Sequence, residues 1–225
     1  MSDASNAAQM LAELPPLSLL LTAYAPRRER AWHSLCWMLD QRLAAVVRRG
    51  GEPTIAAIRL AWWDAVLVEG DDTKGRGEPL VEAWRKTAPD GAAACASLLI
   101  DGWRILLGSE ALTPEDLVHF GAKLGGGLFG LIAGEAHDNQ IAKAGSIWAL
   151  WDLAGHSSAP FLAASAMAEA QAQAASGAKP LPRDRALKPL RLLSHIARAD
   201  VLAGRIPQGF EPRHYRALLW RSLLP

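Results

Sequence analysis

The sequence has little of several features that would assign a protein to a class directly. It contains two cysteines in 225 residues, which gives no indication of a disulfide framework or of a cysteine-rich metal site. Cys36 and Cys95 both lie in apolar helical patterns and are predicted to be buried free thiols. The formal net charge is +1, so the overall charge gives no indication of a nucleic-acid partner.

Long apolar runs are also missing. No stretch reaches about 18 consecutive apolar residues, so no membrane-spanning helix is predicted. The first ten residues, MSDASNAAQM, contain neither a basic segment nor a long apolar run, and no secretory signal is predicted. Residues 1–14 are expected to form a mobile N-terminal segment. A cytoplasmic protein is therefore expected.

Alternation of apolar and polar residues with a period of two, which is typical of β-strands, does not occur over any useful length. Apolar residues instead recur at spacings of three and four, as in helices that pack through one face. The sequence therefore predicts an all-α protein of roughly eight to ten helices, with residues 15–225 in a single domain. Helices are expected over residues 16–26, 29–49, 53–69, 79–87, 90–108, 113–133, 139–155, 158–176, 186–203 and 211–223.

Two of these segments have unusual composition. Residues 53–69 are apolar on most of the helix circumference, including Ile55 and Ile58, and are predicted to form a buried helix. Residues 113–133 begin with an N-cap signature at Thr113 and contain many glycines. Because glycine lowers helix propensity, such density indicates close approach of a neighbouring helix or of a ligand.

Several segments resemble the squalene/phytoene synthase family. IRLAWWDAVL, residues 58–67, resembles a segment of the type IRLQWWRDAL in that family, and CWMLDQRLAAVV, residues 36–47, resembles its first Asp-rich helix. GSIWALWDLAGHSS, residues 145–158, resembles the helix that carries the second Asp-rich motif. The resemblance implies an all-α, isoprenoid-synthase-like fold, in which the two motifs face each other and bind magnesium ions and a prenyl diphosphate.

Both motifs depart from the family pattern. In the first, Asp40 is followed four residues later by Ala44, so the second acid is missing. In the second, Asp152 stands at an Asn position, and His156 replaces the leading Asp. The chain therefore resembles most closely the branch that includes assembly factors of respiratory NADH dehydrogenase, whose members share the fold without a full metal set.

This resemblance implies binding without catalysis. We expect an apolar ligand, isoprenoid-like or quinone-like, or a protein partner, with no metal and no cofactor. The implied pocket is lined by Trp32, Leu43, Ala44, Val47, Trp62, Gly126, Trp148 and His156. The alternative is a divergent magnesium-dependent prenyl diphosphate transferase of the head-to-head type, with Asp40, Asp64 and Asp152 as candidate catalytic residues.

The charged residues also have structural interpretations. Asp40 and Arg42 could form an ion pair at the edge of the core, and Asp64 could pair with another helix. Asp152 and His156 lie one helical turn apart, so they could hydrogen-bond to each other or share one metal ion. The basic C-terminal helices could form a solvated face, or could contact a protein partner or the anionic inner face of a membrane.

Overall fold

Every regular element in the part of the chain that the structure describes is a helix, which confirms the predicted all-α fold. The computed structural model describes residues 14–48, 52–108, 111–134, 138–177 and 179–223. The expected mobility of residues 1–14 thus falls almost entirely outside the described residues, while Leu14 itself is buried. The elements are α2 (Pro16–Tyr24), α3 (Arg30–Arg48), α4 (Pro53–Leu67), α5 (Pro79–Thr87), α6 (Ala92–Ile105), α7 (Pro114–Phe120), η1 (Gly121–Gly125), α8 (Gly126–Ala133), α9 (Asn139–His156), α10 (Pro160–Ala175), α11 (Lys188–Leu202) and α12 (Pro212–Leu223).

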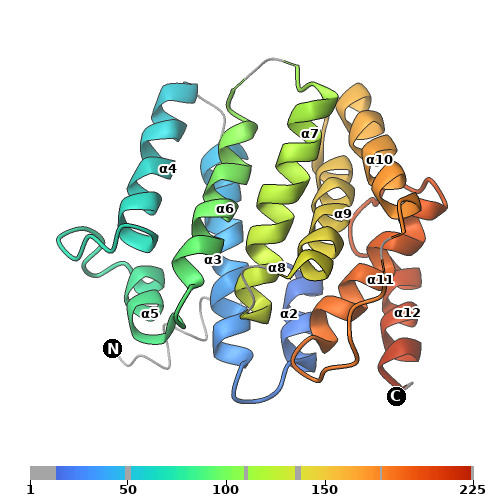
Figure 1. Ribbon diagram of the computed structural model, residues 1–225, viewed down its shortest axis with the longest axis horizontal. Helices are drawn as coiled ribbons and strands as arrows, with labels where there is room; N and C mark the ends of the chain where they lie inside the picture. The colour runs from blue at the N-terminus through green and yellow to red at the C-terminus, as the bar shows by residue number, and fades with distance from the viewer. Residues whose placement is uncertain (1–13, 49–51, 109–110, 135–137, 178, 224–225) are drawn as a thin grey trace.

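Helix α9 is the element around which the bundle is arranged, because it contacts η1, α7, α8, α10 and α11. Helices α4 and α5 lie at one edge of the molecule, and α10 and α12 lie toward the opposite edge (Figure 1). Helix α3 contacts α2, α4, α5, α6 and α8. None of the described helices is long and apolar enough to cross a membrane.

The helix starts follow local sequence signals. Thr113 and Asp116 form a capping box, in which the Asp116 backbone N–H donates to Thr113 Oγ1 and the Thr113 N–H donates to Asp116 Oδ2. Asp138 caps α9 by accepting hydrogen bonds from the backbone N–H groups of Gln140 and Ile141. These caps fix the starts of α7 and α9.

The glycine-rich segment packs directly against two neighbouring helices. A Cβ atom on Gly125 would collide with the backbone of Gly145 in α9, and one on Gly127 would lie 2.5 Å from the backbone nitrogen of Leu99 in α6. Close helix packing, the first interpretation of these glycines, is therefore confirmed at these positions. The segment is not one regular helix, because η1 is a π-helical turn between α7 and α8.

The prediction that residues 53–69 form a buried helix is only partly correct. Ile55 and Ile58 are 47% and 65% exposed, whereas the buried face consists of Leu60, Trp63, Ala65, Val66 and Leu67. The reason is the position of α4 at the edge of the bundle, where its main contacts among the described residues are with α3, α5 and α6. The predicted free thiols are confirmed, because Cys36 and Cys95 are both buried and unbonded to each other.

Candidate functional site

An aromatic pocket of about 250 Å³ lies where α2, α3, α9 and α11 meet. We call it the aromatic pocket throughout. Its walls consist mainly of apolar side chains, with Gln41, Asp152 and His156 as the polar groups from α3 and α9. The other residues that line it are Pro15, Pro16, Leu17, Ser18, Leu21, Trp37, Trp148, Trp151, Gly155, Leu193, Pro207, Gly209 and Phe210.

The helical repeat explains which residues reach this pocket. Trp37 and Gln41 are four residues apart on α3, so they lie on one face of that helix. On α9, Trp148, Trp151 and Asp152 satisfy the same spacing rule and form the facing wall. Helices α3 and α9 thus bring together positions that are more than 100 residues apart in the sequence.

Two indole N–H groups in the pocket wall have no hydrogen-bond acceptor. The Nε1 atoms of Trp37 and Trp151 are buried and unpartnered in the described structure, although both residues line the pocket. The ring of Trp37 instead packs edge-on against Trp148. A buried donor without an acceptor costs roughly 1–3 kcal/mol, so a ligand that displaced the atoms covering either N–H and offered an acceptor would recover free energy.

Asp40 lies beside this wall but is buried in the core. Its Oδ1 atom accepts a hydrogen bond of 3.1 Å from the indole N–H of Trp103 on α6. Burial, and then the negative charge of Asp152, raise the pKa of Asp40 from 3.8 to about 7, against the opposing effects of Trp103, Arg48 and His156. Asp40 therefore carries a proton for much of the time at neutral pH.

Asp152 and His156 contact each other, as their spacing predicted. His156 Nδ1 lies 3.2 Å from Asp152 Oδ2 and 2.9 Å from the Asp152 carbonyl oxygen. The hydrogen bond and the charge of Asp152 raise the pKa of His156. The structure thus places Asp40, Asp152 and His156 in one region between α3 and α9, which are the positions that the resemblance relates to the two Asp-rich motifs.

The loop that closes the pocket is held by an ionic cluster that sequence reasoning did not find. Asp200 on α11 is buried and lies 2.7 Å from His214 Nε2, 3.1 Å from Arg205 Nε and 3.4 Å from Arg213. Burial raises the pKa of Asp200, but the hydrogen bonds from His214 and Arg205 outweigh this and lower it. The imidazole of His214 also contacts the ring of Phe210 in the pocket wall.

A signal for this cluster was present in the sequence. Asp200 follows Ile196 and Ala197 and precedes Val201, so an acid stands on the apolar face of its helix. A buried acid requires partners, and the partners come from the loop and helix that follow. The sequence does not show which residues these partners are, and the structure identifies them as Arg205, Arg213 and His214.

The other predicted site residues lie elsewhere. Asp64 forms a 2.8 Å ion pair with Arg104, which in turn bonds to Asp101, in agreement with the structural interpretation of Asp64. The predicted Asp40–Arg42 ion pair is wrong, because Arg42 is exposed and Asp40 is buried against Trp103.

Of the residues predicted to line a cavity, Trp148 and His156 line the aromatic pocket. Leu43, Ala44 and Gly126 are buried in helix contacts, Val47 and Trp62 are half-buried, and Trp32 packs on Trp84 while its indole donates to the carbonyl of Leu131. These residues belong to the packing of the bundle around the pocket.

Comparison of this chain with protein-family models, with curated proteins and with solved structures gives no match. Among the described residues, no group of three or more His, Cys, Asp or Glu side chains is placed to hold a metal ion.

Proposed function

We propose that this protein binds, without prenyl-transferase chemistry, a small apolar molecule that carries a carbonyl or other acceptor oxygen, of which a quinone headgroup is the model. In this proposal the chain is a squalene/phytoene synthase-like protein with an isoprenoid-synthase-like fold and degenerate Asp-rich motifs. It resides in the cytoplasm, or at the inner face of the membrane. The observation that carries the proposal is a pair of unpartnered indole N–H groups, on Trp37 and Trp151, that are buried within the wall of an apolar pocket.

The pocket favours an acceptor oxygen over a plain hydrocarbon. Its apolar walls stabilise any uncharged ligand in proportion to the buried area, at about 25 cal/mol per Å². Trp37 and Trp151 add a preference, because a ligand that displaced the atoms covering either buried N–H would accept one hydrogen bond that the described structure lacks. A net hydrogen bond contributes roughly 0.5–1.5 kcal/mol, which corresponds to about a twofold to tenfold gain in affinity.

The electrostatics of the same region oppose a free diphosphate. Asp152 lines the pocket and Asp40 lies behind it, close enough for their charges to interact. A diphosphate placed there would add negative charge beside a carboxylate, and burial of such a charge is costly without cations or many donors. An uncharged ligand avoids this cost, which supports the binding proposal over the transferase.

The proposal can be tested by calorimetric titration with a short-chain quinone and with a hydrocarbon of matched size that has no oxygen. We expect saturable binding of the quinone and weaker binding of the hydrocarbon. Trp37→Phe and Trp151→Phe should each weaken quinone binding by about twofold to tenfold, because phenylalanine keeps the aromatic wall and removes one donor.

Trp62→Phe is the matched control, because Trp62 is half-buried and does not line the aromatic pocket. The Trp62→Phe variant should bind the quinone with the same affinity as the unmodified protein. Equal affinity for quinone and hydrocarbon, or unchanged affinity in both pocket variants, would remove the basis of the proposal.

A second candidate function is supported by one observation. Asp40 and Asp152 come together across α3 and α9, as the acids of a magnesium-dependent prenyl diphosphate transferase must. The experiment is incubation with farnesyl or geranylgeranyl diphosphate and Mg²⁺, followed by product analysis. Turnover that is lost in Asp152→Asn would establish this alternative, and turnover no greater than that of a heat-denatured sample would eliminate it.

A further inference from the structure

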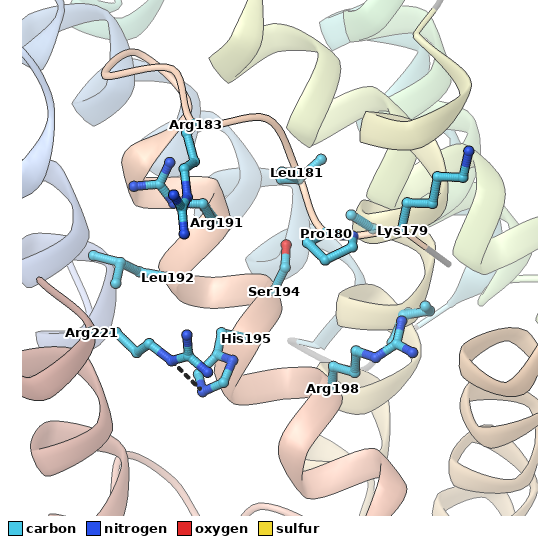
Figure 2. Close-up of a pocket in the computed structure, with 12 residues that line it drawn as sticks. Lys179, Pro180, Leu181, Arg183, Arg191, Leu192, Ser194, His195, Arg198 and Arg221 are labelled. Carbon is cyan, nitrogen blue, oxygen red and sulfur yellow. Dashed lines mark hydrogen bonds between the residues drawn. The ribbon is translucent and has the colours of Figure 1, made fainter. Parts of the chain in front are cut away.

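A second cavity, lined by basic side chains, opens between the loop that precedes α11, the helices α11 and α12, and part of α9. Its volume is about 680 Å³, and no residue lines both this cleft and the aromatic pocket. Figure 2 shows its side chains, with Arg183 and Arg191 toward one end of the view and Lys179 and Arg198 toward the other. We call this cavity the basic cleft.

The charge in the basic cleft is of one sign. Five of the residues that line it are lysine or arginine, and none is acidic. Lys179, Arg183, Arg191 and Arg221 form no ion pair with a carboxylate among the described residues. Like charges in one cavity repel each other, so an anion that entered would relieve the repulsion as well as gain contacts.

The walls of the cleft are held in place without a ligand. Lys143 of α9 donates to the carbonyl of Ser176 at 3.0 Å, and Gln140 of the same helix donates to the carbonyl of Pro180. On the other side, Arg191 donates to the carbonyl of Pro182 at 3.4 Å. A cleft that is already ordered loses little conformational entropy when it binds a ligand.

The pKa of His195 reflects its burial and the positive charge beside it. Arg221 Nε donates to His195 Nε2 at 3.3 Å, as the dashed line in Figure 2 marks. Burial, followed by the positive charge of Arg221, lowers the pKa of His195. The imidazole therefore accepts this hydrogen bond in its neutral form, and the guanidinium keeps its other donors for a ligand.

We propose that the basic cleft binds the phosphate group of an amphiphilic phosphate ester. Guanidinium groups match phosphate oxygens in geometry and charge. Ala144, Ile147, Leu181 and Leu192 supply apolar surface in the same cavity, which suits an ester whose other part is uncharged. The proposal is independent of the function assigned to the aromatic pocket.

The phosphate could belong to a free molecule or to a membrane lipid. Helix α12 presents Trp220, 70% exposed, and Leu219, 43% exposed, next to Arg221 of the cleft. Exposed tryptophan and leucine beside arginine are typical of segments that contact the membrane interface. We therefore expect the lipid source to bind more tightly than the free ester.

The experiment has two arms. Phenyl phosphate serves as the free ester in a calorimetric titration, and vesicles of phosphatidylcholine with or without phosphatidylglycerol serve as the lipid in a flotation assay. We expect binding to the phosphatidylglycerol vesicles and weaker binding of phenyl phosphate. Arg183→Gln and Arg221→Gln should each weaken binding about fivefold, since each basic residue contributes similarly at an anionic surface.

Arg59→Gln is the matched control, because Arg59 is exposed on α4 at the opposite edge of the molecule (Figure 1). Arg183 makes no hydrogen bond to another described residue, so its replacement should leave the melting temperature unchanged. Binding in either arm that depends on Arg183 and Arg221 but not on Arg59 supports the cleft, and the arm identifies the source. No binding in either arm, or equal binding by all variants, overturns it. Trp37→Phe and Trp151→Phe should leave this binding intact, so failure here is distinguishable from failure at the aromatic pocket.

Discussion

The indole N–H of Trp103 on α6 donates to the carboxylate of Asp40 on α3 across 3.1 Å, within the core of the bundle. Asp40 is 3% exposed, so this bond is its main compensation for loss of hydration. A buried carboxylate that is only partly compensated becomes easier to protonate. The protonation state of Asp40 therefore changes with pH near neutrality, and the free energy of unfolding should change with pH as a result.

The first prediction concerns Asp40→Asn. The folded pKa of about 7 lies above the reference value of 3.8, so the contribution of Asp40 to stability is fully present below about pH 4 and is lost as the pH rises to about 7. The loss amounts to roughly 1.4 kcal/mol per pH unit within that window. Asparagine stays neutral, so the variant should become more stable relative to the unmodified protein as the pH rises from 5 to 8.

Urea denaturation of both proteins at several pH values measures this difference. His33 also titrates, since burial lowers its pKa to about 4, and its contribution to stability is lost as the pH falls below about 6.5. That effect is common to both proteins and cancels in the comparison. A constant difference between them from pH 5 to pH 8 would contradict the raised pKa of Asp40.

The second prediction concerns Trp103, which donates the hydrogen bond to Asp40. Trp103→Phe should destabilise the protein by about 2–3 kcal/mol at pH 8, because a hydrogen bond to a charged group is lost in the core. At pH 5, where Asp40 is protonated, the cost should be smaller. In the Asp40→Asn background the cost should also fall, and a double-mutant cycle measures the coupling. Additive effects at pH 8 would show that the two side chains do not interact.

The third prediction compares two adjacent glycines. Gly127→Ala should cost about 3 kcal/mol or more, because the new Cβ would meet the backbone of α6 at 2.5 Å. Gly126→Ala should instead stabilise the protein by about 0.5–1 kcal/mol, since its nearest neighbour would be the Ala142 side chain at 3.6 Å and alanine favours helices. Thermal melting of the two variants distinguishes them. Equal losses of stability in the two variants would indicate that these glycines are not required for close contact between helices.

The fold could be predicted from the sequence to a large extent because its signals are local. The spacing of apolar residues gave α3 and α9 within a residue or two, and Thr113 marked the start of α7. Burial of α4 could not be predicted from Ile55 and Ile58, because an apolar helix is buried only if neighbours surround it. That depends on where the bundle ends, which no local pattern contains.

The candidate site could be predicted only in part. The resemblance predicts that Asp40 and Asp152 face each other, and the contact of Asp152 with His156 agrees with their spacing. The unpartnered donors of Trp37 and Trp151 could not be foreseen, because whether a buried indole finds an acceptor depends on distant residues. The basic cleft likewise needed the loop before α11 to fold back on α9.

A crystal structure of the protein with a short-chain quinone tests most directly whether the aromatic pocket binds a quinone. We expect the quinone ring in the aromatic pocket, with a carbonyl oxygen at a hydrogen-bond distance of about 2.7–3.2 Å from Nε1 of Trp37 or Trp151. A quinone bound elsewhere, or seated in this pocket with its oxygens turned away from both indoles, would contradict it.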